Sequence, residues 1–211
     1  AAGRPLTNVP VQLTLRRHAF GFGSASPAKW ILDESEDGRR WREIADRYFS
    51  LIVFENDLKD FDWKPDASPE QRARRNERLD RAFAWLAERH IAVRGHYLVQ
   101  VARPPNLQGV TNAEILRAHF LKSAQERVAF AGNRVVEWDV INHPVAWSGA
   151  DMLNRVPGLE HLDREVLALA RSLTHLPLLV NEDQLFRPGR QSDETYAYVD
   201  ALNRAGLHVD G

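Results

Sequence analysis

The sequence contains no cysteine among its 211 residues. Disulfide frameworks, thiolate zinc sites and cysteine nucleophiles are therefore excluded. The absence of cysteine leaves the redox compartment of the protein open.

An excess of charge of one sign is also lacking. Lys and Arg together number 28 and Asp and Glu together 29, giving a formal net charge of -1 with both signs interspersed. No basic face points to a nucleic acid. No apolar run approaches the roughly 20 residues that cross a membrane, and no charged-then-apolar leader precedes a cleavage site. We therefore expect neither a nucleic acid nor a membrane as a partner.

The length suits one domain with a sizeable core, because domains reach roughly 250 residues before they divide. We expect residues 1–211 to form a single domain, with 1–19 as a lead-in strand segment in which Val9, Val11, Leu13 and Leu15 alternate with polar residues. The chain begins without methionine and stops directly after a strand-like stretch, so both ends are expected to continue in a longer protein.

Strand-like and helix-like stretches then alternate along the chain. Buried strands are expected over 18–25, 49–54, 91–99, 135–143 and 178–183, with a sixth from His208, and helices over 37–48, 68–86 and 111–128, from Asp163 and from Ser192 to Gly206. Ser68 and Thr111 each open a capping-box pattern, Ser192 is the expected cap of the last helix, and Gly206 stands where a helix ends.

This alternation predicts an α/β fold with a parallel sheet and helices outside it. Five complete strand–helix units and a sixth strand are more than most simple open sheets contain. A (β/α)8 TIM-barrel type is therefore favoured, and such a barrel has about eight strands and about 250 residues. We expect about the first five to six βα units to be present. Open strand edges at the missing units would allow self-association with another chain.

The run Val135-Val136-Glu137-Trp138-Asp139-Val140-Ile141-Asn142-His143-Pro144 is the stretch that points most directly to function. Its β-branched residues predict a strand, and the proline ends it. Asn142 and His143 therefore lie at the carboxyl end of a strand. In parallel α/β folds the loops at that end enclose the active site.

The same run resembles the fourth-strand motif Trp-Asp-Val-Val-Asn-Glu-Pro of glycoside hydrolase family 10, the xylanase family. Three further stretches, in the right order, resemble the family's second-, third- and fifth-strand motifs: Glu55-Asn56-Asp57-Leu58-Lys59, Arg94-Gly95-His96-Tyr97-Leu98-Val99 and Asn181-Glu182-Asp183-Gln184. The start of the first strand also fits, and the resemblance runs from about Phe20 to Gly211.

The resemblance implies recognition of β-1,4-linked xylan or a related polysaccharide, without a cofactor, in an extracellular protein. It implies that sugar hydroxyls are bound by Glu55, Asn56, Lys59, His96 and Asn142, and that Glu182 keeps the carboxylate of the fifth strand. Without the resemblance, the acidic stretch after residue 54 is an ordinary solvated loop, and a histidine in an apolar strand is a core residue with a satisfied partner.

Two departures from the family motifs put hydrolysis in doubt. His143 stands at the position of the acid/base glutamate, and Gln100 replaces a tryptophan on which the sugar stacks. Retaining glycosidases need two carboxyl groups about 5–5.5 Å apart, and the second belongs to a later strand. Hydrolysis is therefore expected to be impaired or absent. Three hypotheses remain: part of a xylan-cleaving barrel, a non-catalytic saccharide-binding relative, or a barrel fragment that assembles with another chain.

A metal site is the remaining alternative at these strand ends. Histidine and carboxylate side chains of the kind that bind zinc or manganese gather there: His96, His143, Glu55, Asp57 and Asp183. No His-x-His or His-Glu-x-x-His pattern accompanies them. We therefore expect no metal.

Overall fold

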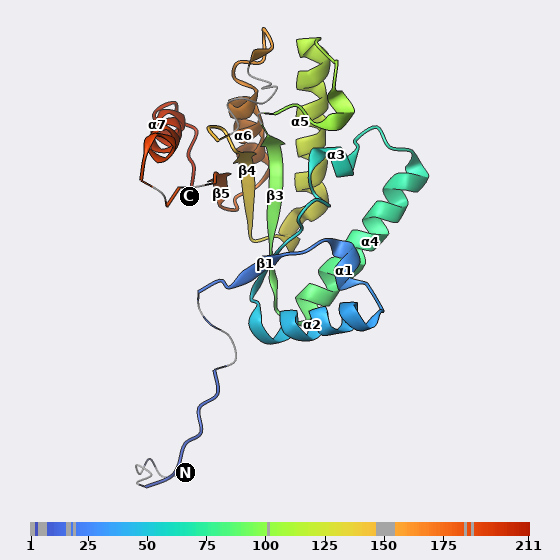
Figure 1. Cartoon of the computed structure of the whole chain (residues 1–211), viewed down its shortest axis with the longest axis vertical. Helices are drawn as coiled ribbons and strands as arrows, with labels where there is room; N and C mark the ends of the chain where they lie inside the picture. The colour runs from blue at the N-terminus through green and yellow to red at the C-terminus, as the bar shows by residue number, and fades with distance from the viewer. Residues whose placement is uncertain are drawn as a thin grey trace.

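The computed structural model describes residues 3, 8–15, 18, 20–100, 102–146, 155–183, 185–186 and 188–211. Within these residues five parallel strands follow one another across a single sheet in chain order (Figure 1). The strands are β1 (Gly23–Ala25), β2 (Leu51–Val53), β3 (Ala92–Gln100), β4 (Glu137–Asn142) and β5 (Leu178–Asn181). Parallel strands that lie side by side in chain order, with helices between them, are typical of the wall of a (β/α)8 barrel. The expected (β/α)8-type fold is confirmed for these units.

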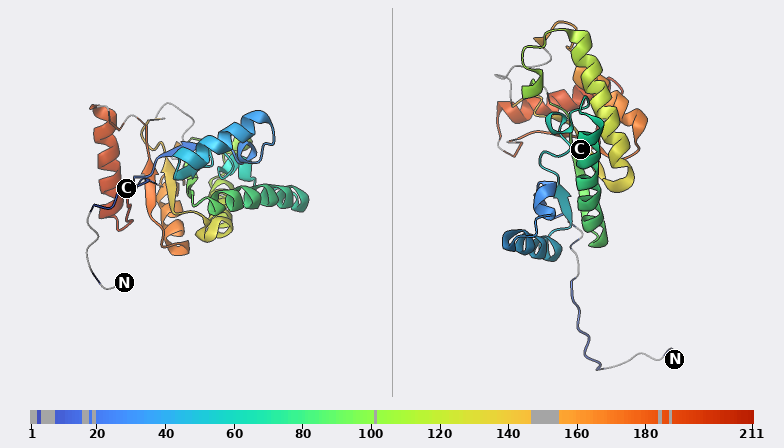
Figure 2. Two further views of the ribbon diagram at one scale, coloured as in Figure 1. Left: turned by 90° about the horizontal axis from the view of Figure 1, so that it is seen from below. Right: turned by 90° about the vertical axis from the view of Figure 1, so that its right-hand side faces the viewer.

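Helices connect the strands, as βαβ crossovers require. They are α1 (Ala28–Ile31), α2 (Glu36–Tyr48), α3 (Asp60–Trp63), α4 (Pro69–Glu88), α5 (Ala113–Ala131), α6 (Leu162–Leu173) and α7 (Arg190–Arg204), with 3₁₀ turns η1 (Pro105–Leu107) and η2 (Gly132–Arg134). Figure 2 shows α7 at the opposite end of the sheet from α2 and α4. None of these helices is both long and apolar enough to cross a membrane.

The expected lead-in strand is absent from the described part of the amino-terminal segment. Residues 8–15 are irregular, and Val11 and Leu13 are 76% and 89% exposed. The segment extends away from the body of the protein (Figure 1). An alternating pattern becomes a strand only where a neighbouring strand accepts its hydrogen bonds, and no described strand lies beside residues 8–15. The first core strand is likewise shorter than expected, since β1 begins at Gly23 rather than His18.

The chain after α7 partly confirms the expected sixth strand. The backbone N–H of Asp210 donates to the carbonyl of Leu178 (2.8 Å), and that of Val180 donates to the carbonyl of Gly211 (3.0 Å). No regular strand is assigned to these residues. The last residues therefore lie along the outer edge of β5, where the sixth strand was expected.

The first residues of α4 form the capping box that the sequence predicted, whereas the caps of α5 and α7 differ from the predicted ones. Ser68 Oγ accepts from the N–H of Gln71 (3.3 Å) and Gln71 Oε1 accepts from the N–H of Ser68 (3.0 Å), a complete capping box. In α5 the cap is Asn112 rather than Thr111, because the Asn112 side chain accepts from the N–H of Ile115 (3.1 Å).

The last helix begins two residues before the expected cap. Ser192 lies inside α7, where its hydroxyl donates to the carbonyl of Gly189 (2.8 Å). The end is as expected: Gly206 has φ of +80°, and the N–H of Leu207 donates to the carbonyl of Leu202 (3.0 Å). This is a Schellman motif, in which glycine adopts the left-handed conformation at no steric cost.

The core lies between the sheet and the helices that cover it, and Trp138 of β4 is its largest fully buried side chain. Gly95 of β3 faces this indole so closely that a Cβ atom would lie 2.3 Å from Trp138 Cε3. Only glycine fits there. Packing of β3 on β4 therefore fixes the residues on either side of Gly95, which belong to the candidate site.

Candidate functional site

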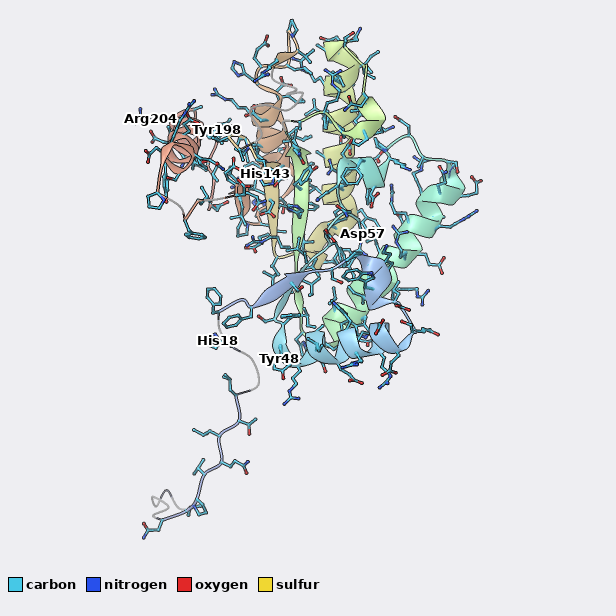
Figure 3. The ribbon with its side chains drawn as sticks, in the orientation of Figure 1. His18, Tyr48, Asp57, His143, Tyr198 and Arg204 are labelled. Carbon is cyan, nitrogen blue, oxygen red and sulfur yellow. The ribbon has the colours of Figure 1, made fainter. Side chains whose placement is uncertain are left out.

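The carboxyl ends of β2, β3, β4 and β5 bring the expected site residues to one edge of the sheet. Figure 3 labels His143 where β4 and β5 end. Asn142 is the last residue of β4, and His143 follows with φ of +51°. The N–H of His143 donates to the carbonyl of Asn181 in β5 (2.8 Å). A positive φ is uncommon outside glycine, so the neighbouring strand holds this histidine in an unusual backbone conformation.

The imidazole of His143 contacts the carboxylate of Glu182. His143 Nδ1 lies 3.1 Å from Glu182 Oε1. The N–H groups of Val145 and Ala146 donate to Oε2 at 2.8 and 3.0 Å, and that of Asp183 donates to Oε1 at 3.0 Å. The Glu182 side chain is 0% exposed. Glu182 was expected to contact substrate, but protein groups already occupy both of its oxygens. Its position instead favours a role in orienting the imidazole.

The amide of Asn142 is also engaged by the protein. Asn181 Nδ2 donates to Asn142 Oδ1 (2.7 Å), and Asn142 Nδ2 donates weakly to Gln100 Oε1 (3.4 Å). Asn142 is only 3% exposed. Gln100, at the position where the resemblance expects a stacking tryptophan, therefore joins this row of amides at the ends of β3, β4 and β5.

A charged network crosses the inner face of the sheet below these amides. Arg94 Nε lies 2.6 Å from Glu137 Oε1, and Arg94 Nη1 lies 3.7 Å from Asp139 Oδ1. His96 Nδ1 lies 2.8 Å from Asp139 Oδ2. Asp139 is buried, and the side chain of His96 is 15% exposed. His96 therefore has the partner expected of a core histidine and also keeps some exposed surface.

The end of β2 carries the remaining expected contacts. Glu55 is exposed and Asn56 is half-buried. Lys59 is half-buried, with Nζ 5.3 Å from the centroid of the Tyr97 ring. Burial lowers the pKa of the Lys59 ammonium, although the charges of Glu55 and Asp62 act in the opposite direction. Within the described contacts, the ammonium forms no hydrogen bond or ion pair.

The five residues considered as metal ligands do not gather at one point. Asp57, labelled in Figure 3, points away and accepts from the N–H of Ala28 (2.8 Å) and from Arg78 (3.3 Å). A smaller group remains, in which donor atoms of His143, Glu182 and Asp183 lie within 4.8 Å of one another. The Glu182 oxygens already accept four hydrogen bonds, so this group has little capacity left for a cation. Gln184 lies outside the described residues.

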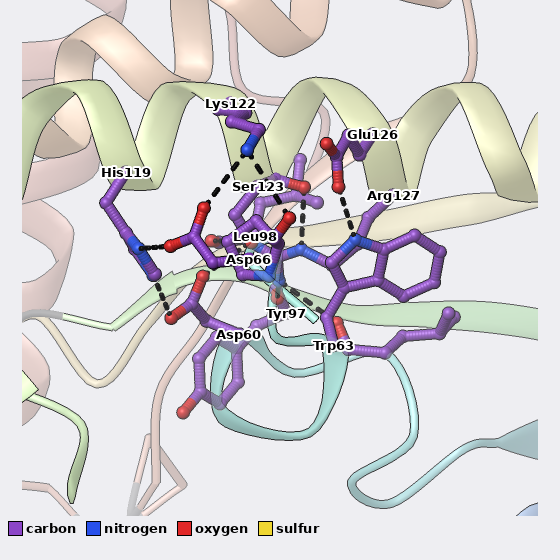
Figure 4. Close-up of polar contacts among 12 residues, drawn as sticks. Asp60, Trp63, Asp66, Tyr97, Leu98, His119, Lys122, Ser123, Glu126 and Arg127 are labelled. Carbon is purple, nitrogen blue, oxygen red and sulfur yellow. Dashed lines mark hydrogen bonds and ion pairs between the residues drawn. The ribbon is translucent and has the colours of Figure 1, made fainter. Parts of the chain in front are cut away.

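A buried arginine of α5 connects the loop after β2 with β3 (Figure 4). The Arg127 side chain is 0% exposed and donates to the carbonyls of Leu58 (3.0 Å), Tyr97 (2.5 Å) and Leu98 (2.8 Å). Two of these carbonyls belong to sequence neighbours of expected site residues, since Leu58 precedes Lys59 and Tyr97 follows His96. Sequence reasoning missed this residue. The available signal was its spacing of seven residues from buried Phe120, which places Arg127 on the apolar face of the helix.

Asp60 supplies the negative charge next to this arginine. Its carboxylate lies 2.8 Å from His119 Nε2 and 3.9 Å from Arg127 Nη2 (Figure 4). Burial raises the pKa of Asp60, but the hydrogen bond from His119 and the charge of Arg127 outweigh it, so the pKa lies below its ordinary value. Asp60 is therefore an anion that His119 and Arg127 hold next to the loop after β2.

These features define a partial (β/α)8 barrel with a polar site at its strand ends. The chain belongs to glycosyl hydrolase family 10, whose family model matches residues 13–211. A curated relative, endo-1,4-beta-xylanase A of Thermotoga maritima, is 23% identical over an alignment of 218 positions, and this alignment covers 98% of this chain and 20% of that protein. The expected family is confirmed.

Solved structures show the same fold. Xylanase 10B from Thermotoga petrophila RKU-1, in complex with xylobiose, has a TM-score of 0.73 at 22% sequence identity. The match covers 90% of this chain and 57% of the xylanase chain. The endo-1,4-beta-xylanase XylE of Penicillium canescens has a TM-score of 0.73 at 18% sequence identity, and the match covers 90% of this chain and 58% of XylE. The chain thus spans little more than half the length of these structures and a fifth of the curated relative.

Proposed function

We propose that this domain recognises β-1,4-linked xylan or a related polysaccharide at the ends of β2 to β5, and that its hydrolytic activity is impaired or absent. The relatives named above are xylanases, and one was solved with xylobiose. The proposed sugar contacts are Glu55, Asn56, Lys59, His96 and Asn142. These groups suit a ligand that is rich in hydroxyls, because each buried hydroxyl needs a hydrogen-bond partner.

The contact of His143 with Glu182 carries the proposal of impaired hydrolysis. A retaining glycosidase needs two carboxyl groups about 5–5.5 Å apart. At the end of β4 an imidazole stands in place of the first, 3.1 Å from a carboxylate that is itself fully hydrogen-bonded. The imidazole is able to donate a proton in principle. Glu182 is unsuited to act as a nucleophile, since attack would require it to leave three backbone N–H groups.

Two assays on the same preparation test both halves of the proposal. Titration calorimetry with xylotetraose is expected to give saturable binding, and incubation with xylan is expected to release no reducing sugar. Asn56→Ala should weaken binding, whereas Arg204→Ala, an exposed change on α7, should not. No heat from a folded protein contradicts saccharide recognition. Release of reducing sugar that disappears in His143→Ala contradicts impaired hydrolysis.

Self-association is a second candidate, favoured by the amino-terminal segment. Val11 and Leu13 expose most of their surface in an alternating pattern, and β1 is the outer strand of the described sheet. A second copy of this chain offers the same segment as a strand partner. Sedimentation is expected to show a dimer that is weakened by Leu13→Lys. A monomer at every concentration, without dye-binding apolar surface, contradicts this candidate. An extracellular location, which the family suggests, and a single-domain organisation, which the chain length suggests, remain proposals.

A further inference from the structure

A cavity of about 350 Å³ lies where the chain passes from α3 into α4. Its volume falls within the range of about 300–1,000 Å³ that is common for ligand sites. Basic side chains dominate its walls, since four of the eight residues that line it are basic and only Asp62 is acidic. The basic residues are Lys64, Arg74, Arg75 and Arg78. The cavity is therefore a candidate site for an anion.

The burial of Arg75 distinguishes this cavity from an ordinary solvated row of arginines on a helix. Arg75 is only 8% exposed, and its Cζ lies 3.4 Å from the centroid of the Trp63 ring. Its Nε and Nη2 donate to Asn76 Oδ1 (3.2 and 3.1 Å), and its Nη1 donates to the carbonyl of Trp63. A guanidinium has five N–H donors. Two of those on Arg75 therefore have no acceptor among the described residues, and none of its described acceptors is a carboxylate.

The charge of Arg75 has lost most of its hydration without gaining an anion in exchange. Burial lowers the pKa of Arg75 to about 10. Glu126 acts in the opposite direction, but its carboxylate accepts from Trp63 Nε1 (3.0 Å; Figure 4), and the charges of Arg72 and Arg78 again lower the pKa. A buried charge without a partner is unfavourable, and hydrogen bonds between two charged groups are among the strongest. Arg75 therefore gains from an anion that enters the cavity.

The acidic groups around the cavity leave it with an excess of positive charge. Asp57 lies 3.3 Å from Arg78 Nη2 and compensates that arginine. Asp62 lines the cavity, and burial together with the charge of Asp57 raises its pKa. Lys64 and Arg74 are exposed and form no ion pair among the described residues. Four cations thus face two carboxylates, and the excess matches a ligand with two negative charges.

We propose that this cavity binds a phosphate monoester, whose phosphoryl group carries nearly two negative charges at pH 7 and three acceptor oxygens. Arg74 and Arg75 donate to these oxygens, because the fork of a guanidinium matches the geometry of a phosphate. A carboxylate or a sulfate ester has a single negative charge and compensates only half of the excess. None of the residues that line the cavity is a proposed sugar contact, so the inference stands apart from the proposed function.

Titration calorimetry on the 211-residue chain at pH 8 tests the proposal with two probes, methyl phosphate and its singly charged diester dimethyl phosphate. The monoester is expected to bind about tenfold more tightly than the diester. Arg74→Gln should weaken binding of the monoester about tenfold. The matched control is Arg81→Gln, which changes another exposed arginine of α4, seven residues further along, that does not line the cavity. The control should bind as the wild type does.

The outcomes separate a built site from a general effect of positive charge. Equal affinities for the monoester and the diester overturn the inference, as does equal weakening by Arg74→Gln and Arg81→Gln, because binding then belongs to the basic helix as a whole. Absence of heat from a folded chain with both probes also overturns it. Arg75→Met should abolish binding of the monoester, and if this variant does not fold, the Arg74→Gln and Arg81→Gln pair decides. Binding of xylotetraose should be unchanged in Arg74→Gln, so either proposal can fail without the other.

Discussion

The imidazole of His143 and the carboxylate of Glu182 lie 3.1 Å apart across the ends of β4 and β5. Three backbone N–H groups hold the same carboxylate, so it is a fixed acceptor to which the histidine side chain adapts. An anion held in this way orients an imidazole, as the carboxylates that hydrogen-bond to metal-binding histidines do in other proteins. The side chain of His143 is therefore built into the structure through a fixed partner.

Glu182→Ala is expected to destabilise the protein strongly. It removes the acceptor for three part-buried backbone N–H groups and the partner of His143, and each unsatisfied donor costs about 1–3 kcal/mol when buried, so the low end of this range applies to each. Urea denaturation should show a loss of about 3 kcal/mol or more. The matched control is Glu194→Ala, which removes an exposed carboxylate and should cost less than about 0.5 kcal/mol. Similar losses for the two variants would contradict a fixed role for Glu182.

His143→Glu is expected not to restore hydrolysis in the 211-residue chain. The new carboxylate would face the buried anion of Glu182, and like charges at this distance repel. We expect a loss of stability of about 1–3 kcal/mol and no release of reducing sugar from xylan. His143→Gln, which keeps a hydrogen-bond donor without the charge, should be less destabilising. Measurable turnover by His143→Glu would refute this account of the site.

Gly95→Ala tests the contact between β3 and β4. The added methyl group would lie 2.3 Å from Trp138 Cε3, and neither the strand nor the fully buried indole has room to move. Overpacking of this kind typically costs about 1–3 kcal/mol. Thermal denaturation should show the loss. Gly109→Ala is a control with open space around its Cβ position but a positive φ, so it measures backbone strain alone. A wild-type melting temperature for Gly95→Ala would contradict the packing described here.

Arg127→Lys is expected to weaken both stability and saccharide binding. The ammonium of lysine cannot reach the carbonyls of Leu58, Tyr97 and Leu98 together, as the guanidinium does. We expect a loss of about 1–3 kcal/mol from the carbonyls left without a donor, and weaker binding of xylotetraose, because the carbonyls of Leu58 and Tyr97 adjoin Lys59 and His96. Lys122→Ala, on the exposed face of the same helix, should have little effect on either. Unchanged binding in a destabilised variant would limit Arg127 to a purely structural role.

The stability of the protein is expected to depend on pH through Asp60. Because the folded-state pKa of Asp60 lies below its ordinary value, its contribution to stability is present above pH of about 4 and is lost as the pH falls through the folded-state pKa. Asp60→Asn should therefore destabilise most at pH 7, with the difference from wild type shrinking below a pH of about 4. Urea titrations across this range test it. Asp200→Asn, at an exposed ion pair on α7, should show no such dependence.

Local patterns in the sequence predicted most of the fold. The capping box at Ser68 and the glycine ending of α7 at Gly206 depend on residues a few positions apart, so short-range rules describe them correctly. The prediction of a strand over residues 9–15 was wrong because a strand depends on a partner elsewhere in the chain. A strand needs a partner, and periodicity alone does not say whether one is present.

The sequence by itself determined the family, the order of strands and helices, and which residues reach the strand ends. All of these follow from the spacing of apolar residues and from motifs at fixed positions. Only the tertiary structure decided which contacts those residues make. Three backbone N–H groups donate to Glu182, and Arg127 connects the loop after β2 with β3. Lys59 and Arg103 line one cavity. These contacts join residues distant in the chain, and hydrogen bonding and burial at such contacts depend on the packed arrangement of the strands and helices.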